Sequence, residues 1–186
     1  MSTAIKQEII LDAYVGLLYD HGTREATIDA TAKRSGLSKA GLLHHFKNRQ
    51  ALDTELVRRL NELIDADVAA MRANLAQAVH YYFASSMEED SPLERMVVAS
   101  TRLAQRGNAD ASAALRRGRD LWFQVLNDAL GDPVLAKLAL LAGDGVSYHL
   151  DISRGHHDEF LTAQTIEQLV QRFSGQAVAS GAQSGK

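Results

Sequence analysis

The sequence predicts an all-α protein with an N-terminal three-helix helix-turn-helix unit and a C-terminal helical bundle, about nine helices in total. Apolar residues recur every three or four positions along most of the chain, which is the period of an amphipathic helix. No segment shows the apolar–polar alternation of a strand. Both prolines, Pro92 and Pro133, follow a capping residue and therefore mark helix starts.

The first helix is predicted to end at His21, because Gly22 is a natural C-cap. Its apolar positions at helical spacing are Ile9 or Ile10, Ala13 or Tyr14, and Leu17.

Two short helices meeting at a glycine follow. Thr27 is placed to cap a helix over residues 28–34, and Gly36 supplies the positive φ of a tight turn. Ser38 caps the next helix, in which Leu42 and Phe46 lie four apart on the buried side. Such a pair predicts a helix-turn-helix, whose second helix can enter a DNA major groove.

The charges of this segment favour the same function. Residues 33–49 hold five basic and no acidic residues: Lys33, Arg34, Lys39, Lys47 and Arg49. Residues 1–50 carry seven basic and five acidic residues, a net +2 within a chain whose formal net charge is −3. A solvated positive face or an ordinary αα-corner is the alternative. The small, polar outer face of the second helix favours DNA.

The stretch TIDATAKRSGLSKAGLLHHFKNRQAL (27–52) resembles the DNA-binding segment of the tetracycline-repressor (TetR) family. The resemblance lies in the opening Thr, in A-K-R-x-G-L-S-K across the turn, and in L-x-x-H-F-x-N-x-x-A-L beyond it. It covers about the first quarter of the chain. Three positions depart from the pattern: Thr31 replaces an aliphatic residue, Leu43 a phosphate-contacting Tyr, and Arg49 a Lys.

Each residue of this segment can be given an expected role. The residues expected to enter the DNA major groove are Lys39, Ala40, Gly41 and His44. Lys39 could donate hydrogen bonds to guanine, and the small Ala40 and Gly41 would let the helix approach the bases closely. The residues expected to contact the DNA phosphates are Thr27, His45, Lys47 and Arg49, and Lys33 is a further candidate. Ser38, as the cap, and Leu43, by its position in the family pattern, complete the predicted DNA-binding set.

Beyond residue 48 the chain reads as a helical body. Asn48 caps a long helix with a stripe of Leu52, Leu56, Leu60 and Leu63, which joins the DNA unit to the body. A helix from Met71 to Ser86 carries Leu75, Val79 and Phe83. Ser91-Pro92 and Asp132-Pro133 start two later helices, and Gly107-Asn108 separates the helix after Pro92 from one with a stripe of Leu115, Gly118, Trp122, Val125 and Ala129.

The last two long helices are predicted to form a homodimer. Residues 134–152 are apolar on nearly all sides at first, which indicates burial on two faces, and Gly143 and Gly145 suggest close approach by another helix. Ile166 and Phe173 belong to the stripe of the final helix. The pair suits a four-helix interface with a second copy, and the resemblance implies the same dimer. Two recognition helices then call for a palindromic operator in double-stranded DNA.

The resemblance also implies a small-molecule effector bound among helices five to eight. The candidate lining residues are Phe83, Met87, Met96, Ser100, Leu103, Trp122, Phe123, Tyr148 and His149. Ordinary core packing is the alternative for each of them. Tyr148 and His149 are singled out because a buried Tyr or His needs a polar partner.

Other classes of function find little support in the sequence. The chain has no cysteine, which excludes disulfides and thiolate chemistry, and no catalytic or phosphate-loop motif, so we expect no enzyme and no cofactor. No signal peptide or membrane span is visible, which predicts a cytoplasmic protein. His44 and His45 point about 100° apart and do not share a metal. His156-His157, beside Asp158, could bind one only adventitiously.

The sequence therefore predicts a DNA-binding domain over 1–48, a ligand-binding and dimerisation domain over 49–174 and a disordered tail over 175–186. The predicted function is a ligand-responsive homodimeric repressor. The alternative is a small-molecule carrier or protein-interaction module that does not read DNA sequence.

Overall fold

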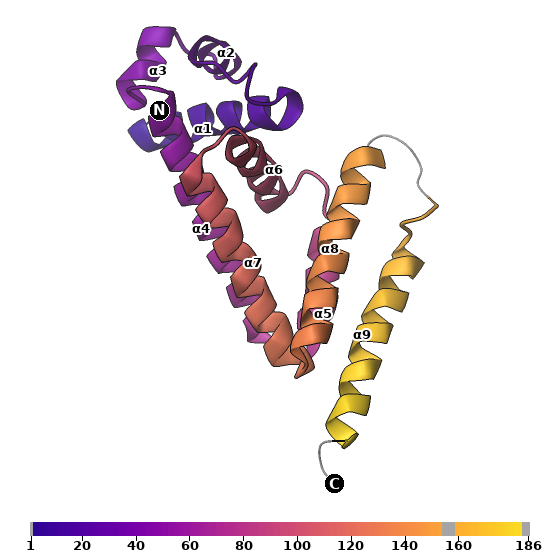
Figure 1. Cartoon of the computed structure of the whole chain (residues 1–186). Helices are drawn as coiled ribbons and strands as arrows, with labels where there is room; N and C mark the ends of the chain where they lie inside the picture. Colours follow the sequence, from indigo (N-terminus) through magenta and orange to yellow (C-terminus); the bar gives the residue numbers. More distant parts are fainter. Residues whose placement is uncertain (1, 154–158, 184–186) are drawn as a thin grey trace. The chain divides into compact units, whose positions relative to one another are not determined.

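The computed structural model of the chain describes residues 2–153 and 159–183, and these form nine α-helices, one short 3₁₀ helix and no strand (Figure 1). The predicted all-α fold is confirmed. The elements are α1 (Thr3–His21), α2 (Ile28–Arg34), α3 (Lys39–His45), α4 (Arg49–Ala73), η1 (Leu75–Gln77), α5 (Ala78–Ser86), α6 (Pro92–Gln105), α7 (Ala109–Leu130), α8 (Pro133–Ser153) and α9 (Ala163–Gln183).

The helices form two compact units. Unit 1 contains Met1–Ile64 and Asp90–Arg117, and unit 2 contains Asp65–Glu89 and Gly118–Lys186. Helices α4 and α7 each contribute their first part to unit 1 and their second part to unit 2. The predicted domain boundary at residue 48 stays a prediction.

Unit 1 is organised around α1, which packs against α2, α3 and α6 (Figure 1). Ile10, Tyr14 and Leu18 of α1 are completely buried, whereas Ile9 lies outside the core. Helix α1 ends as predicted at His21, and its C-cap Gly22 has a φ of 78° and donates its amide to the Leu18 carbonyl at 3.0 Å. The predicted cap of α6 is also present, because the amide of Glu94 donates to Ser91 Oγ at 3.1 Å.

Two expectations for the middle of the chain are wrong in detail. The buried row of α4 continues from Leu60 to Ile64 rather than to Leu63, which is only half-buried. No continuous helix runs from Met71 to Ser86, because α4 extends to Ala73 and η1 separates it from α5. Leu75 is consequently exposed instead of belonging to the core stripe.

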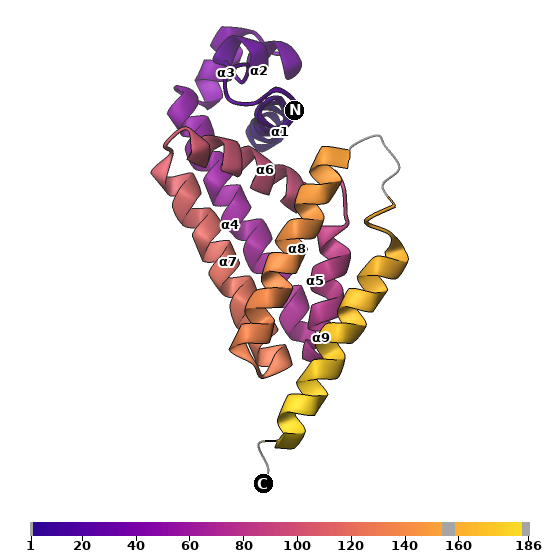
Figure 2. The ribbon, with the colours of Figure 1, turned by 45° about the vertical axis from the view of Figure 1, so that its right-hand side comes forward.

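In unit 2, α5 packs against both α8 and α9 (Figure 2). Phe83 of α5 stacks on Phe173 of α9 with ring centroids 5.5 Å apart. Tyr82 lies against Gly143 of α8, so the predicted close approach of another helix is confirmed at this glycine. Gly145 has open space beside it and does not mark such an approach.

The last helix is longer than the sequence indicated. Helix α9 continues to Gln183, past residue 174, after which we expected a disordered tail. The small-residue composition that suggested disorder includes alanines, which have the highest helix propensity. None of the described helices is long and apolar enough to cross a membrane.

Candidate nucleic-acid interface

The turn between α2 and α3 has the geometry that the sequence predicts. Thr27 Oγ1 accepts the amide of Ala30 at 3.1 Å, and Ser38 Oγ accepts the amide of Gly41 at 3.0 Å. Gly36 adopts a φ of 70°, a conformation open to glycine at low cost. Leu42 and Phe46 are buried beneath α3. These contacts fix α3 against α2 and leave its opposite face to solvent.

That outer face carries most of the predicted groove residues. Lys39, Ala40 and His44 are exposed, and Gly41 is half-buried on the same short helix. Of the residues predicted to contact phosphate, Thr27, Lys33 and Lys47 are exposed, whereas His45 and Arg49 are half-buried. Leu43 is half-buried as well. The structure therefore brings all eleven predicted residues into one segment, and their contacts with DNA stay a prediction.

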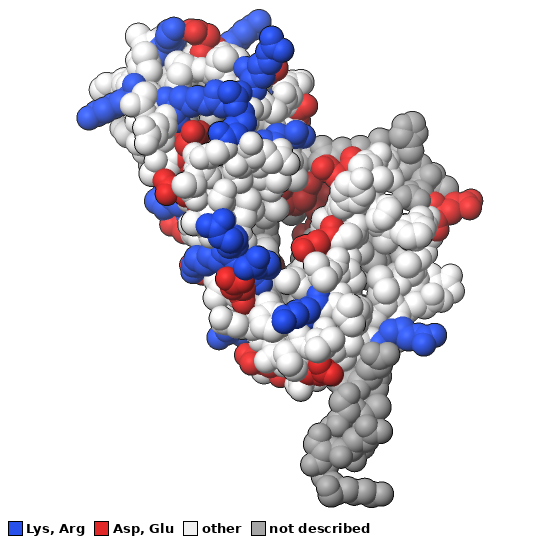
Figure 3. Space-filling model, in the orientation of Figure 1, with Lys and Arg blue, Asp and Glu red and all other residues white. Residues whose placement is uncertain are grey.

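Positive charge gathers at this end of unit 1. In Figure 3, Lys and Arg side chains cover much of the surface over α1–α3. Arg34 is held to Asp20 at 2.8 Å, and Lys39 Nζ lies 3.0 Å from Asp29 Oδ2. Neither Lys33 nor Lys47 has an ion pair with any described residue. Among the residues predicted to contact phosphate, these two ammonium groups therefore have no charged partner within the described part of the protein.

The ion pair between Lys39 and Asp29 was missed at the level of sequence. Both side chains are largely exposed, at 58% and 70%, and they join the recognition helix α3 to α2. Asp29 lies in the first turn of α2, where an acidic residue is expected for the helix dipole alone. In this structure Lys39 is thus partly neutralised by Asp29.

Arg49 has an internal role that its predicted phosphate contact did not include. Its Nε donates to Tyr14 Oη at 3.2 Å, and its Nη2 donates to the carbonyl of Thr23 at 3.0 Å. Tyr14 in turn donates to Asp53 at 2.5 Å. Burial and the hydrogen bond to Asp53 raise the pKa of Tyr14, so the phenol stays protonated. This chain of contacts ties α1 to the start of α4.

Thr31 shows why a polar residue is tolerated in the buried face of α2. It is completely buried, and its hydroxyl donates to the carbonyl of Thr27 at 2.8 Å. A buried hydroxyl that is hydrogen-bonded avoids most of its desolvation cost. The departure from the family pattern is therefore accommodated within α2 itself.

The nine candidate ligand residues are divided between the units: Met96, Ser100 and Leu103 lie in unit 1, and the other six in unit 2. Ser100 is fully buried, and its hydroxyl finds no hydrogen-bond partner among the described residues. Met87 and Phe123 are half-buried, and Lys137 Nζ lies 6.0 Å from the Phe123 ring centroid. Their role as a ligand pocket stays a proposal.

Unit 2 contains a polar cluster that only partly overlaps this set. Trp122 Nε1 donates to Asp67 Oδ2 at 2.7 Å, and Tyr81 Oη donates to Asp67 Oδ1 at 3.1 Å. Burial raises the pKa of Asp67, and both hydrogen bonds oppose that shift. Sequence analysis picked out Trp122 but neither Asp67 nor Tyr81, since each reads alone as an ordinary helix residue.

The reason for singling out Tyr148 was wrong. Tyr148 is 62% exposed, so it is not a buried phenol in need of a partner. The ring centroid of Tyr148 lies 5.6 Å from that of His149, and the ring centroid of His149 lies 4.8 Å from that of Phe160. His156-His157 falls outside the described residues. Within the described part of the chain, no group of three or more acidic or His side chains is placed to hold a metal.

Comparison with known proteins agrees with this geometry. Residues 10–56, which span most of α1 to the first part of α4, match the model of the bacterial regulatory proteins of the tetR family. This segment belongs to the TetR family of bacterial regulatory proteins.

Two relatives are HTH-type transcriptional regulators called BetI. The one from Serratia proteamaculans is 25% identical over 141 residues, or 75% of this chain and 62% of the relative. The one from Cronobacter sakazakii is 32% identical over 74 residues, or 40% and 37% of the two chains. This chain thus matches less than two thirds of the length of either relative.

Solved structures share the fold over nearly the whole chain. A transcriptional regulator from Rhodococcus sp. Rha1 superposes with a TM-score of 0.72 at 17% identity, covering 93% of this chain and 96% of its own. The fatty acid degradation regulator FadR from Bacillus halodurans gives 0.63 at 15% identity, covering 91% and 98%. At these identities the likeness concerns the fold alone.

Proposed function

We propose that this TetR-family chain is a transcriptional regulator that binds double-stranded DNA through α3, acting as a homodimeric, ligand-responsive repressor. The observation that carries the proposal is the capped turn between α2 and α3, which presents Lys39, Ala40 and His44 to solvent. A short helix with small residues and one long cation on its outer face suits the major groove.

The dimer is proposed from the exposed face of α8. Large apolar side chains there are 53–64% exposed and recur at alternating spacings of four and three: Val134, Leu138, Leu141, then Tyr148 and Ile152, with Gly145 in between. This is the spacing of a coiled-coil seam, and such a patch on a monomer marks an interaction site. A copy of α8 has the complementary pattern, and a two-fold dimer would call for a palindromic operator.

Oligomeric state is tested by sedimentation of the protein and of Leu141→Glu. The parent should sediment as a dimer, and the variant as a folded monomer, because a charge in the seam stays unpaired. Glu25→Gln, an exposed position outside α8 and α9, serves as the control and should leave the dimer intact. A monomeric parent, or a dimeric Leu141→Glu, would refute the α8 interface.

DNA reading is tested by selection of fragmented genomic DNA at about 0.15 M salt, where non-specific phosphate binding is weak. Recovery of a few fragments that share an inverted repeat is expected. Recovery of nothing, or of all DNA equally, would favour the alternative of a carrier or interaction module.

Two lysine variants separate base reading from phosphate binding. Lys39→Ala should relax the base preference, with a loss of about 1–3 kcal/mol for the preferred sequence. Lys47→Ala should weaken binding to all sequences alike and reduce the salt slope by about 1. Lys47 is preferred to Arg49 here because Arg49 also ties α1 to α4, so its loss would perturb the fold. Variants that bind like the parent would refute the contact assignment.

A further inference from the structure

Within unit 1, α1, α4 and the start of α6 line a cavity of about 600 Å³ that is open to solvent and that the proposed DNA contacts do not use. This volume is in the range of small-molecule sites. Leu11, Val15 and Met96 give it an apolar floor, and all three are buried. Three arginines and four carboxylates stand around that floor. An apolar floor with a charged rim is the composition of a site for a small polar ligand.

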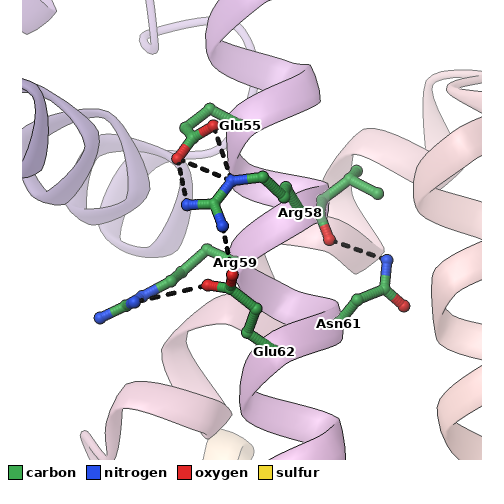
Figure 4. Close-up of polar contacts among 6 residues, drawn as sticks. Glu55, Arg58, Arg59, Asn61 and Glu62 are labelled. Carbon is green, nitrogen blue, oxygen red and sulfur yellow. Dashed lines mark hydrogen bonds and ion pairs between the residues drawn. The ribbon is translucent and has the colours of Figure 1, made fainter.

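Part of the rim is satisfied by its own neighbours. Arg58 donates through Nη2 and Nε to Glu55, at 2.6 Å and 3.0 Å to its two oxygens, and through Nη1 to Glu62 (Figure 4). The hydrogen bonds to Glu55 raise the pKa of Arg58. Arg58 and Glu55 therefore form a fixed wall along α4, with no unmet charge toward the cavity.

The other two arginines are held loosely. Arg59 Nη1 lies 3.5 Å from an oxygen of Glu62, the carboxylate that also accepts from Arg58 (Figure 4). Arg95 Nη1 lies 3.5 Å from Asp90, and its guanidinium stands 5.0 Å above the Tyr19 ring centroid. Charge-assisted hydrogen bonds are normally about 2.7–2.9 Å long. Each guanidinium therefore keeps donors for another acceptor.

Across the cavity, α1 presents two exposed carboxylates that no described protein group neutralises by a direct contact. Glu8 and Asp12 are four residues apart on one face of the helix, where like charges repel. Neither forms a hydrogen bond or ion pair with any described residue. Asp12 is exposed, but partial desolvation and then Glu8 raise its pKa, whereas Arg95 and Arg59 lower it. The charges of Arg59 and Arg95 thus act on Asp12, although Asp12 forms an ion pair with neither.

We propose that this cavity binds a small zwitterion with an apolar side chain, such as a free α-amino acid. Its ammonium group would lie on Glu8 and Asp12, its carboxylate between Arg59 and Arg95, and its side chain on the floor of Leu11, Val15 and Met96. A simple anion would meet the two α1 carboxylates, and a simple cation would meet the two arginines. Only a ligand with both a positive and a negative charge can pair with the carboxylates of α1 and with the two arginines at the same time.

The test is titration calorimetry of the full chain with L-leucine and with L-phenylalanine. Two analogues keep the leucine side chain but lose one charge: 3-methylbutylamine lacks the carboxylate, and 4-methylpentanoate lacks the ammonium. At least one amino acid should bind with a dissociation constant below about 1 mM, and each analogue at least about tenfold more weakly than L-leucine where L-leucine binds. Where only L-phenylalanine binds, phenethylamine and 3-phenylpropanoate replace the analogues.

Charge-removing variants identify the site. Asp12→Asn and Arg59→Gln should each weaken amino-acid binding about tenfold, while Asp12→Asn should leave the carboxylate analogue unaffected or better bound. Glu25→Gln, an exposed carboxylate outside the cavity, is the control. Circular dichroism melts confirm that each variant is folded. No amino-acid binding at about 10 mM, analogues that bind as well as the amino acid, or an Asp12→Asn protein that behaves like the control would overturn the proposal.

Discussion

Gly143 and Gly145 lie two residues apart on α8, and the structure predicts opposite effects of adding one methyl group to each. A Cβ at 143 would stand 2.3 Å from Tyr82 Cε1 and 3.0 Å from Cζ. Tyr82 is buried, and its hydroxyl donates to the Leu140 carbonyl at 3.3 Å, so the ring cannot move without loss. A Cβ at 145 meets no atom within 4 Å.

The magnitudes follow from these contacts. Alanine is favoured over glycine in a helix by about 1 kcal/mol, which Gly145→Ala should gain. Gly143→Ala has the same gain, but overpacking costs about 1–3 kcal/mol and loss of the Tyr82 hydrogen bond about 1 kcal/mol. We therefore expect Gly143→Ala to lower the free energy of unfolding by about 1–3 kcal/mol.

Urea unfolding followed by circular dichroism, at one protein concentration, measures both variants. Because Gly145 lies in the proposed dimer seam, the pair is also compared in the Leu141→Glu background, where the seam is not formed. Tyr82→Leu removes the ring, and in that background Gly143→Ala should no longer destabilise. Equal stability of the two alanine variants, or a Gly143→Ala cost that persists without the ring, would refute this account of α8.

Three further predictions concern polar groups. Trp122→Phe should lower the free energy of unfolding by about 1.5–3 kcal/mol, because Asp67 loses a charge-assisted hydrogen bond; an unchanged urea midpoint would contradict this. Asp144 is an exposed residue, but neighbouring groups partly desolvate its carboxyl and raise its pKa above 3.8, so its ionisation opposes folding weakly, and the penalty grows as the pH rises from 3.8 through the folded-state value. Asp144→Asn should accordingly stabilise the protein at pH 7, and this gain should shrink toward pH 4 in urea titrations; a gain independent of pH would contradict it. Asp29→Ala should strengthen DNA binding about two- to fivefold by releasing Lys39, and an unchanged or weaker affinity in a fluorescence anisotropy titration would rule that ion pair out as a competitor.

Local signals in the sequence were enough for much of the fold. A cap, a positive-φ glycine and a four-residue apolar spacing are each decided within a single turn, and Thr27, Gly36 and Leu42 behave as predicted. The break between α4 and α5 was missed because the apolar positions continue across it. Leu75 fits the period of the stripe, but the chain turns at η1 and leaves this side chain exposed.

The polar contacts within each unit were not predictable in the same way. Arg49 was expected to face phosphate on the strength of its charge and position, yet its guanidinium is bound by Tyr14, which lies 35 residues earlier. Trp122 and Asp67 are 55 residues apart. Such pairs depend on how the helices pack against one another, and the local pattern of a single sequence does not show which helices come together. The candidate residues of an interface can be proposed from a motif, but the contacts that they make within the protein are seen only in the fold.

Helix α8 shows how one sequence can encode two contacts. Its buried residues, among them Leu135, Ala139 and Val146, face the rest of unit 2, where Gly143 admits the Tyr82 ring. Its other apolar residues follow a spacing that averages 3.5 and remain exposed. The sequence alone shows only that the helix is apolar nearly all round. The structure separates the two faces, and the exposed face with the coiled-coil period is the one that we propose contacts a second copy of the chain.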